Sequence, residues 1–122
     1  MPIIIDQHTS VLVQGITGYQ GSFHTKQMLA YGTKLVAGVT PGRGGAQVEN
    51  IPVYDSVRAA LEQHDVDVSV LFTPGAVAKD AAFEALEGGV KTLVILAEHV
   101  PLHDAMEIIA FSERIGARVI GP

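Results

Sequence analysis

The fold of this chain is decided by residues 13–21, which read VQGITGYQG and join a β-rich run to a segment with helical spacing. Residues 10–14 are the β-rich run, and residues 22–31 carry apolar side chains at helical spacing before Gly32 ends the helix. A glycine-rich turn between a strand and a helix is typical of doubly wound α/β folds. It aims backbone N–H groups and the positive end of the helix at a phosphate.

Each glycine of this turn has a separate expected role. We expect Gly15 to permit the tight turn, Gly18 to let an anion approach the backbone, and Gly21 to allow close packing of helix on strand. The spacing is GxxGxxG and not the GxGxxG of the common dinucleotide fingerprint. The alternative is a turn that needs its glycines only to connect the two elements. Side chains that add donors to the turn are Thr17, Tyr19 and Gln20.

The rest of the chain repeats the alternation of strand and helix. Further strands are expected at residues 35–39, 53–54, 68–72, 92–96 and 119–120. Further helices are expected from Asp55 or Ser56 to residue 64, over residues 77–86, and from Pro101 to residue 115. Short connections between alternating elements predict an α/β fold: a Rossmann-like, doubly wound, mostly parallel sheet in a single domain over residues 1–122.

Composition excludes several classes of protein. The 122 residues contain no cysteine, which excludes a disulfide scaffold, a cysteine-ligated zinc site and a thiol nucleophile within them. No apolar run approaches the ~18 residues of a membrane span, so no membrane partner is expected. The formal net charge of -5 argues against non-specific binding of nucleic acid.

The end of the second strand separates the possible ligands. An NAD site of this fold needs Asp or Glu there to bind the ribose hydroxyls, and residues 35–43 contain no acid. Arg43 instead offers a bidentate donor for a phosphate on the ribose. NADP carries that phosphate at the 2′ position and coenzyme A at the 3′ position. The alternative for Arg43 is an ordinary exposed loop arginine.

Two more strand ends face the same expected crevice, because ligands of such sheets bind at the carboxyl ends of the strands. Residues 71–75 include Phe72 and Pro74 and form an apolar wall suited to an adenine or a pantetheine arm. The fifth strand ends in Leu96, Ala97 and Glu98. Glu98 is a candidate acceptor for a ligand amide or hydroxyl, or else a solvated loop carboxylate.

The chain resembles a known family over residues 1–122. The motifs are QGITGYQGSFH at 14–24, YGTK at 31–34, GVTPGRGG at 38–45, IPVY at 51–54 and VIGP at 119–122. They resemble the amino-terminal CoA-binding domain of the alpha subunit of succinyl-CoA synthetase (succinate–CoA ligase), a nucleotide-binding, Rossmann-like part of a ligase of the tricarboxylic acid cycle. The resemblance implies that coenzyme A lies across the strand ends.

The resemblance also implies which residues bind the coenzyme. The positions that match the family's CoA site are Thr17, Gly18, Tyr19, Gln20, Arg43, Leu96, Ala97 and Glu98. Four positions depart from the usual pattern. Arg43 stands where the family usually has Lys, Leu96 and Ala97 where it usually has Ile and Thr, and Tyr19 where a small residue such as Ser is common.

In the family, a nucleoside triphosphate phosphorylates a histidine, the phosphate passes to succinate, and the CoA thiol attacks the acyl phosphate. The resemblance places that histidine in a second, carboxy-terminal domain of the alpha subunit, absent from this chain, and the nucleotide and Mg²⁺ in the beta subunit. We therefore expect CoA binding without catalysis, with the beta subunit and that second domain as partners. The expected location is the cytoplasm, or the mitochondrial matrix after removal of a transit peptide.

None of the five histidines is predicted to be catalytic. His99 and His103 are four residues apart, but Pro101 between them places His99 in a loop, so no metal site is expected. His24 matches a family histidine and is interpreted as a packing or capping residue below the glycine-rich turn. Two other functions remain open: an NADP-binding domain of an oxidoreductase, and a stand-alone CoA-sensing module without chemistry.

Overall fold

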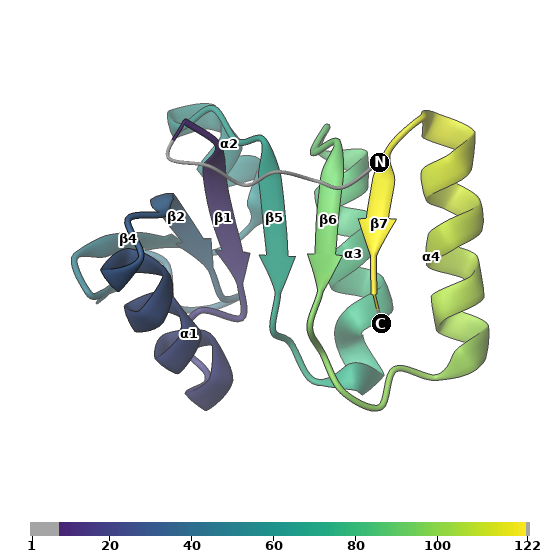
Figure 1. Ribbon diagram of the computed structural model, residues 1–122, viewed down its shortest axis with the longest axis horizontal. Helices are drawn as coiled ribbons and strands as arrows, with labels where there is room; N and C mark the ends of the chain where they lie inside the picture. The colour runs from purple at the N-terminus through teal and green to yellow at the C-terminus, as the bar shows by residue number, and fades with distance from the viewer. Residues whose placement is uncertain (1–7, 122) are drawn as a thin grey trace.

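A computed structural model describes residues 8–121, which form a seven-stranded sheet with helices on both faces (Figure 1). The strands are β1 Ser10–Gln14, β2 Lys34–Val39, β3 Gln47–Val48, β4 Ile51–Tyr54, β5 Val68–Leu71, β6 Thr92–Ile95 and β7 Arg118–Ile120. The helices are α1 Tyr19–Ala30, α2 Val57–Gln63, the short 3₁₀ helix η1 Gly75–Val77, α3 Ala78–Glu87 and α4 Leu102–Ile115.

The strand order is β3-β4-β2-β1-β5-β6-β7, and every pair is parallel except β3 with β4. The chain leaves β1 toward β2 and β4, then returns to place β5 on the other side of β1. This reversal at β1 and β5 creates a crevice at their carboxyl ends, which is where ligands bind in open α/β sheets. The predicted doubly wound, mostly parallel fold is confirmed.

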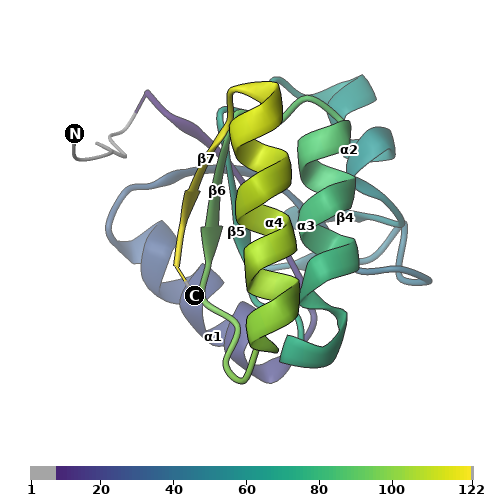
Figure 2. The same ribbon diagram turned by 90° about the vertical axis from the view of Figure 1, so that its right-hand side faces the viewer.

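The two faces of the sheet are covered unequally. Figure 2 shows α2, α3 and α4 together on one face, and α1 on the other. Each face has its own core. Leu12, Leu71 and Leu93 are fully buried under the three-helix layer, whereas Val11 and Val13 point to the α1 side. Successive residues of β1 thus alternate between the two cores, as the two-residue period of a strand requires.

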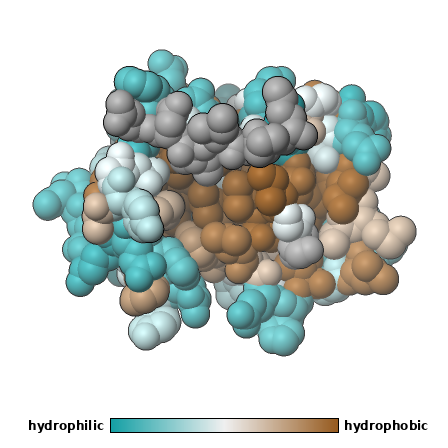
Figure 3. Space-filling view, in the orientation of Figure 1, coloured by the Kyte–Doolittle hydropathy of each residue, from teal (hydrophilic) through white to brown (hydrophobic). Residues whose placement is uncertain are grey.

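On the α1 side, apolar side chains of the later strands remain open to solvent (Figure 3). Val94 belongs to the core on this face, and Leu96 and Ile120 follow it by strand period and register. Leu96 and Ile120 are 51% and 43% exposed. In the part of the chain that is described, no helix covers β6 and β7 on this face.

Within residues 8–121, no helix is long and apolar enough to cross a membrane.

The strict alternation of strand and helix predicted from the sequence is wrong between β2 and β4. That connection holds β3, which pairs antiparallel with β4 through a two-residue turn at Glu49 and Asn50. Both turn residues have positive φ, at 49° and 67°, as a type I′ hairpin turn requires. The turn carries no glycine, so the sequence showed no hairpin signal, and the strand predicted at 53–54 begins at Ile51.

Several boundaries also differ from the prediction. Helix α1 begins at Tyr19 and not at residue 22, so Gly21 lies inside the helix. Strands β5 and β6 end one residue before the predicted positions, and η1 precedes α3 where one continuous helix was predicted from residue 77. The expected helix ends at Gly32 and Gly116 are confirmed by φ values of 87° and 75°. Residue 122, where the sequence resemblance ends, lies outside the described residues.

Helix α2 begins at the second of the two predicted caps. The Ser56 hydroxyl accepts the N–H of Ala59 at 3.1 Å, so Ser56 is the N-cap. The other candidate, Asp55, instead accepts the N–H of Gly44 at 2.8 Å, across the loop that follows β2. The N–H of Val57 donates to Oε2 of Glu84 at 2.8 Å, so this helix start is satisfied by two side chains.

Candidate functional site

The turn between β1 and α1 requires glycine at two positions, residues 15 and 21. Gly15 has φ 81°, and a β-carbon there would lie 3.1 Å from the backbone of Phe72 and Thr73 at the end of β5. A β-carbon on Gly21 would collide with the carbonyl oxygen of Gly15. The roles predicted for Gly15 and Gly21, a tight turn and close helix–strand packing, are therefore confirmed.

Gly18 is the N-cap of α1 and leaves the start of that helix open. Gly18 is exposed, and no protein atom lies closer than 3.5 Å to the place of its missing β-carbon. Neither a side-chain cap nor an acidic residue occupies the first turn. The N–H groups of Tyr19 and Gln20 have no acceptor within the helix, because the first turn of any helix lacks them. In contrast to α2, α1 therefore presents free donors and a positive dipole end.

A pair of threonines ties this turn to the loop after β2. The Thr40 hydroxyl oxygen lies 3.1 Å from the Thr17 hydroxyl oxygen and accepts the backbone N–H of Thr17 at 3.3 Å. The N–H of Thr40 donates to the carbonyl of Tyr54 at 3.0 Å. Thr17 and Thr40 are both partly buried, so these bonds set the spacing between the two loops.

Arg43 lies in the loop that Thr40 begins, and the backbone of this loop is internally bonded. The N–H of Arg43 donates to the carbonyl of Thr40 at 3.0 Å, and the carbonyl of Arg43 accepts from Ala46 at 3.1 Å. The Asp55 carboxylate holds the next residue, Gly44, through its N–H. Arg43 itself is exposed, so an ordered loop presents its guanidinium to solvent.

A cavity of about 340 Å³ opens beside the glycine-rich turn, at the carboxyl ends of β1, β2 and β5. Its lining residues are Gln14, Gly15, Thr17, Gly18, Val39, Thr40, Pro41, Phe72, Thr73, Pro74, Val77, Asp80, Ala81 and Glu84. Four residues predicted for the site line this cavity: Thr17, Gly18, Phe72 and Pro74. Because its lining joins the ends of β1 and β5, the cavity lies where the strand order reverses, as the fold class predicts.

The other six predicted site residues do not line this cavity: Tyr19, Gln20, Arg43, Leu96, Ala97 and Glu98. Tyr19 is 85% exposed on the first turn of α1. The N–H of Leu96 donates to the carbonyl of Leu71 at 3.0 Å, and Leu71 directly precedes the lining residue Phe72. Gly75 contacts the carbonyls of Glu98 and His99, so the loops after β5 and β6 touch. Tyr19 and Gln20 directly follow the lining residue Gly18 in the chain, and Arg43 lies in the loop that begins with the lining residues Thr40 and Pro41.

His24 packs as predicted. Its ring stacks on Phe72, with centroids 5.0 Å apart and planes at 6°, and meets Phe23 edge-on at 5.3 Å. Phe72 also lines the cavity, so the stack joins α1 to the apolar cavity wall. His24 thus supports the site from behind that wall.

Among the cavity residues that sequence reasoning missed are Gln14, Thr73, Asp80 and Glu84. Gln14 is buried, donates to the carbonyl of Ala81 at 2.9 Å, and accepts the Ser69 hydroxyl at 2.6 Å. The Thr73 hydroxyl is buried and has no hydrogen-bond partner among the described residues. The one available signal was a glutamine at the end of an otherwise apolar strand.

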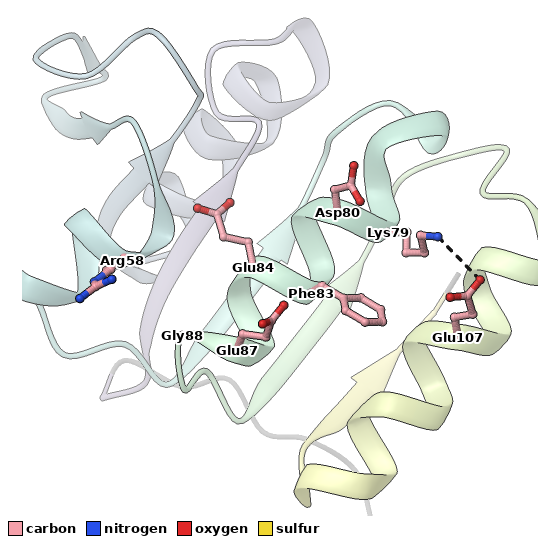
Figure 4. Close-up of a pocket in the computed structure, with 8 residues that line it drawn as sticks. All are labelled: Arg58, Lys79, Asp80, Phe83, Glu84, Glu87, Gly88 and Glu107. Carbon is pink, nitrogen blue, oxygen red and sulfur yellow. Dashed lines mark ion pairs between the residues drawn. The ribbon is translucent and has the colours of Figure 1, made fainter.

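A second and larger hollow of about 770 Å³ lies on the outer side of α3 (Figure 4). Carboxylates dominate its rim, and Lys79 is already engaged by Asp104 at 3.8 Å and Glu107 at 3.7 Å. His103 also meets Glu107, at 2.9 Å. Residues 8–121 contain no cluster of three or more histidine, cysteine or acidic residues placed to hold a metal ion. Arg58 on α2 is the other cation that lines this groove, and the four carboxylates of Asp80, Glu84, Glu87 and Glu107 leave the groove acidic overall.

A parallel sheet with reversed strand order, a glycine-rich turn at an uncapped helix and a cavity beside it define a doubly wound domain of the nucleotide-binding architecture. Comparison with known proteins narrows this class. The family described as CoA binding domain matches residues 6–99, and the chain belongs to this family.

The curated relatives are subunits of CoA ligases. The chain is 52% identical over 122 residues to the alpha subunit 2 of ADP-forming succinate–CoA ligase from Archaeoglobus fulgidus, covering 100% of this chain and 42% of that protein. It is 51% identical to an ADP-forming sulfoacetate–CoA ligase subunit from Acholeplasma sp, covering 99% and 41%. The resemblance to the amino-terminal part of succinate–CoA ligase alpha subunits is confirmed. The chain spans about two fifths of the length of these relatives.

A solved structure of similar size shares the fold. A conserved hypothetical protein from Pyrococcus furiosus superposes with a TM-score of 0.71 at 28% identity. The superposition covers 93% of this chain and 94% of that one. The same architecture therefore occurs in a chain of this length.

Proposed function

We propose that this chain binds coenzyme A at the carboxyl ends of its strands, as the CoA-binding part of a nucleoside-diphosphate-forming acid–CoA ligase. The observation that carries the proposal is the uncapped start of α1 beside a cavity at the strand reversal, in a chain of the CoA-binding family. The ligand's diphosphate lies on the backbone donors of residues 17–20, because free N–H groups and the helix dipole favour an anion there.

The remaining parts of the coenzyme follow from this placement. The Arg43 guanidinium meets the phosphate on the ribose, from an exposed and internally bonded loop. The apolar wall at Phe72 and Pro74 packs against the base, and the pantetheine arm runs along Leu96, Ala97 and Glu98 toward the reacting centre. An acidic chain still binds this anion, since loop amides and a helix end set the local field.

We place the chemistry of the proposed ligase outside the cavity described above. In the proposed enzyme, a beta subunit and a carboxy-terminal alpha domain carry the nucleotide, the metal and the phosphorylated histidine. The chain alone binds CoA and forms no thioester. The relatives are named for succinate or for sulfoacetate, and we place the selection of the acid elsewhere in the proposed enzyme.

Isothermal titration calorimetry with CoA, desulfo-CoA and NADPH tests the proposal. We expect CoA and desulfo-CoA to bind with similar affinity, because the thiol reacts elsewhere, and NADPH to give no comparable heat. Tight binding of NADPH without a response to CoA would establish the oxidoreductase alternative in place of this function.

A further inference from the structure

The walls of the strand-end cavity differ in charge. The glycine-rich turn contributes backbone donors on one side, whereas α3 contributes the carboxylates of Asp80 and Glu84 on the other. Carboxylates repel phosphates, so a phosphate-bearing ligand lies with its phosphates at the turn and its uncharged end toward α3. The side facing α3 must then offer hydrogen-bond donors to these acceptors.

Glu84 is held in place for such a contact. Its Oε2 accepts the N–H of Val57 at 2.8 Å, which ties α3 to the start of α2 and fixes the side chain. No hydrogen bond to its Oε1 is found among the described residues. Figure 4 shows the Glu84 side chain leaving α3 on the side toward α2, whereas Phe83 points toward α4. Glu84 as a whole is half-buried.

We propose that Glu84 is a specificity-determining residue that accepts a hydrogen bond from the exocyclic amino group of the adenine of coenzyme A. This inference rests on the function proposed above. Adenine joined to ribose has that amino group as its one hydrogen-bond donor, and Val39, Pro41 and Phe72 supply apolar surface for the ring faces. A carboxylate beside the amino group selects a base that donates at this position.

The test compares CoA with the analogue in which unsubstituted purine, without the 6-amino group, replaces adenine. Both are titrated calorimetrically into the 122-residue chain and two variants, Glu84→Gln and Glu87→Gln. Glu87 is on the same helix and lines the outer groove but not this cavity, so Glu87→Gln is the matched control. Comparing two ligands within one variant cancels any general loosening at the start of α2.

The wild-type chain and Glu87→Gln should prefer CoA over the purine analogue about tenfold, because a hydrogen bond to a charged acceptor is lost. In Glu84→Gln the preference should fall below about threefold, since the acceptor is no longer charged. An unchanged ratio in Glu84→Gln, or equal binding of both ligands to the wild type, overturns this inference alone. Failure of both ligands to bind the wild type overturns the proposed function itself.

Discussion

Gly21 lies so close to the carbonyl oxygen of Gly15 that no β-carbon fits between them. This contact packs α1 closely onto the end of β1. Gly21→Ala must therefore push helix and strand apart. We expect a loss of about 3 kcal/mol in the free energy of unfolding, and a melting temperature lowered by roughly 10 °C or more. Thermal unfolding followed by circular dichroism measures this.

Gly18→Ala is the counterpart, because Gly18 has φ -72° and open space at its β-carbon. We expect a stability loss of at most about 1 kcal/mol, from a less suitable N-cap. The added methyl group nevertheless occupies the place of the ligand phosphate, so CoA affinity should fall about tenfold or more. If Gly18→Ala bound CoA as the wild type does, the phosphate would not lie at this turn.

The Thr17–Thr40 pair should affect binding by holding two loops in register. Thr40→Val removes the acceptor of the Thr17 N–H, and we expect CoA affinity to fall about fivefold, with about 1 kcal/mol of stability lost. Thr40→Ser keeps the hydroxyl and should bind nearly as the wild type does. The control is Thr33→Val, just before β2, because that end of the strand lies opposite the site. Equal calorimetric affinities for Thr40→Val and Thr33→Val would show that the pair does not shape the site.

Arg43 should distinguish two forms of the coenzyme. Arg43→Ala should weaken CoA about tenfold and dephospho-CoA, which lacks the 3′-phosphate, much less, because a charge-assisted contact to that phosphate is removed. Arg118 is at the start of β7, the end opposite the carboxyl ends of the strands, so Arg118→Ala should change the affinity for neither ligand. Equal losses for both ligands in Arg43→Ala would place Arg43 at the diphosphate, and no loss would make it an ordinary surface residue.

Thr25 gives a prediction about stability alone. It is fully buried on α1, and its hydroxyl has no hydrogen-bond partner among the described residues. Thr25→Val replaces an unsatisfied hydroxyl by a methyl group of similar size and should raise the free energy of unfolding by about 1 kcal/mol. Thr25→Ser keeps the hydroxyl, leaves a small void and should lower it. Urea denaturation of the two variants measures both free energies of unfolding. If Thr25→Val destabilised the chain, the Thr25 hydroxyl would have a hydrogen-bond partner in solution.

Much of the fold is predictable from the sequence because apolar strands and glycine stops are local signals. The runs at β1 and β5 and the helix ends at Gly32 and Gly116 all follow from side-chain type within a few residues. The start of α1 was misplaced because Gly21 looks like part of the turn. The close packing at Gly21 was predicted, but Gly21 makes it from inside the helix, where its missing side chain leaves room for the carbonyl of Gly15.

The site was less predictable because its cavity joins segments far apart in the chain. The glycine-rich turn was recognised from its own residues, but the carboxylates of Asp80 and Glu84 lie on a helix about sixty residues later. Nothing in their local sequence marks them, since charged residues on a helix usually face solvent. Likewise, Gln14 and Thr73 belong to the cavity only because β1 and β5 are neighbours in the sheet.

Binding of coenzyme A at the turn between β1 and α1 can be followed residue by residue through amide chemical shifts. CoA is titrated into the ¹⁵N-labelled chain, and the shift of every assigned backbone N–H is followed. We expect the largest changes at residues 17–20 and in the loop holding Arg43, with little change in the β3–β4 turn at Glu49 and Asn50. Saturating CoA that leaves residues 17–20 unshifted, or shifts concentrated on the outer groove of α3, would contradict binding at this turn.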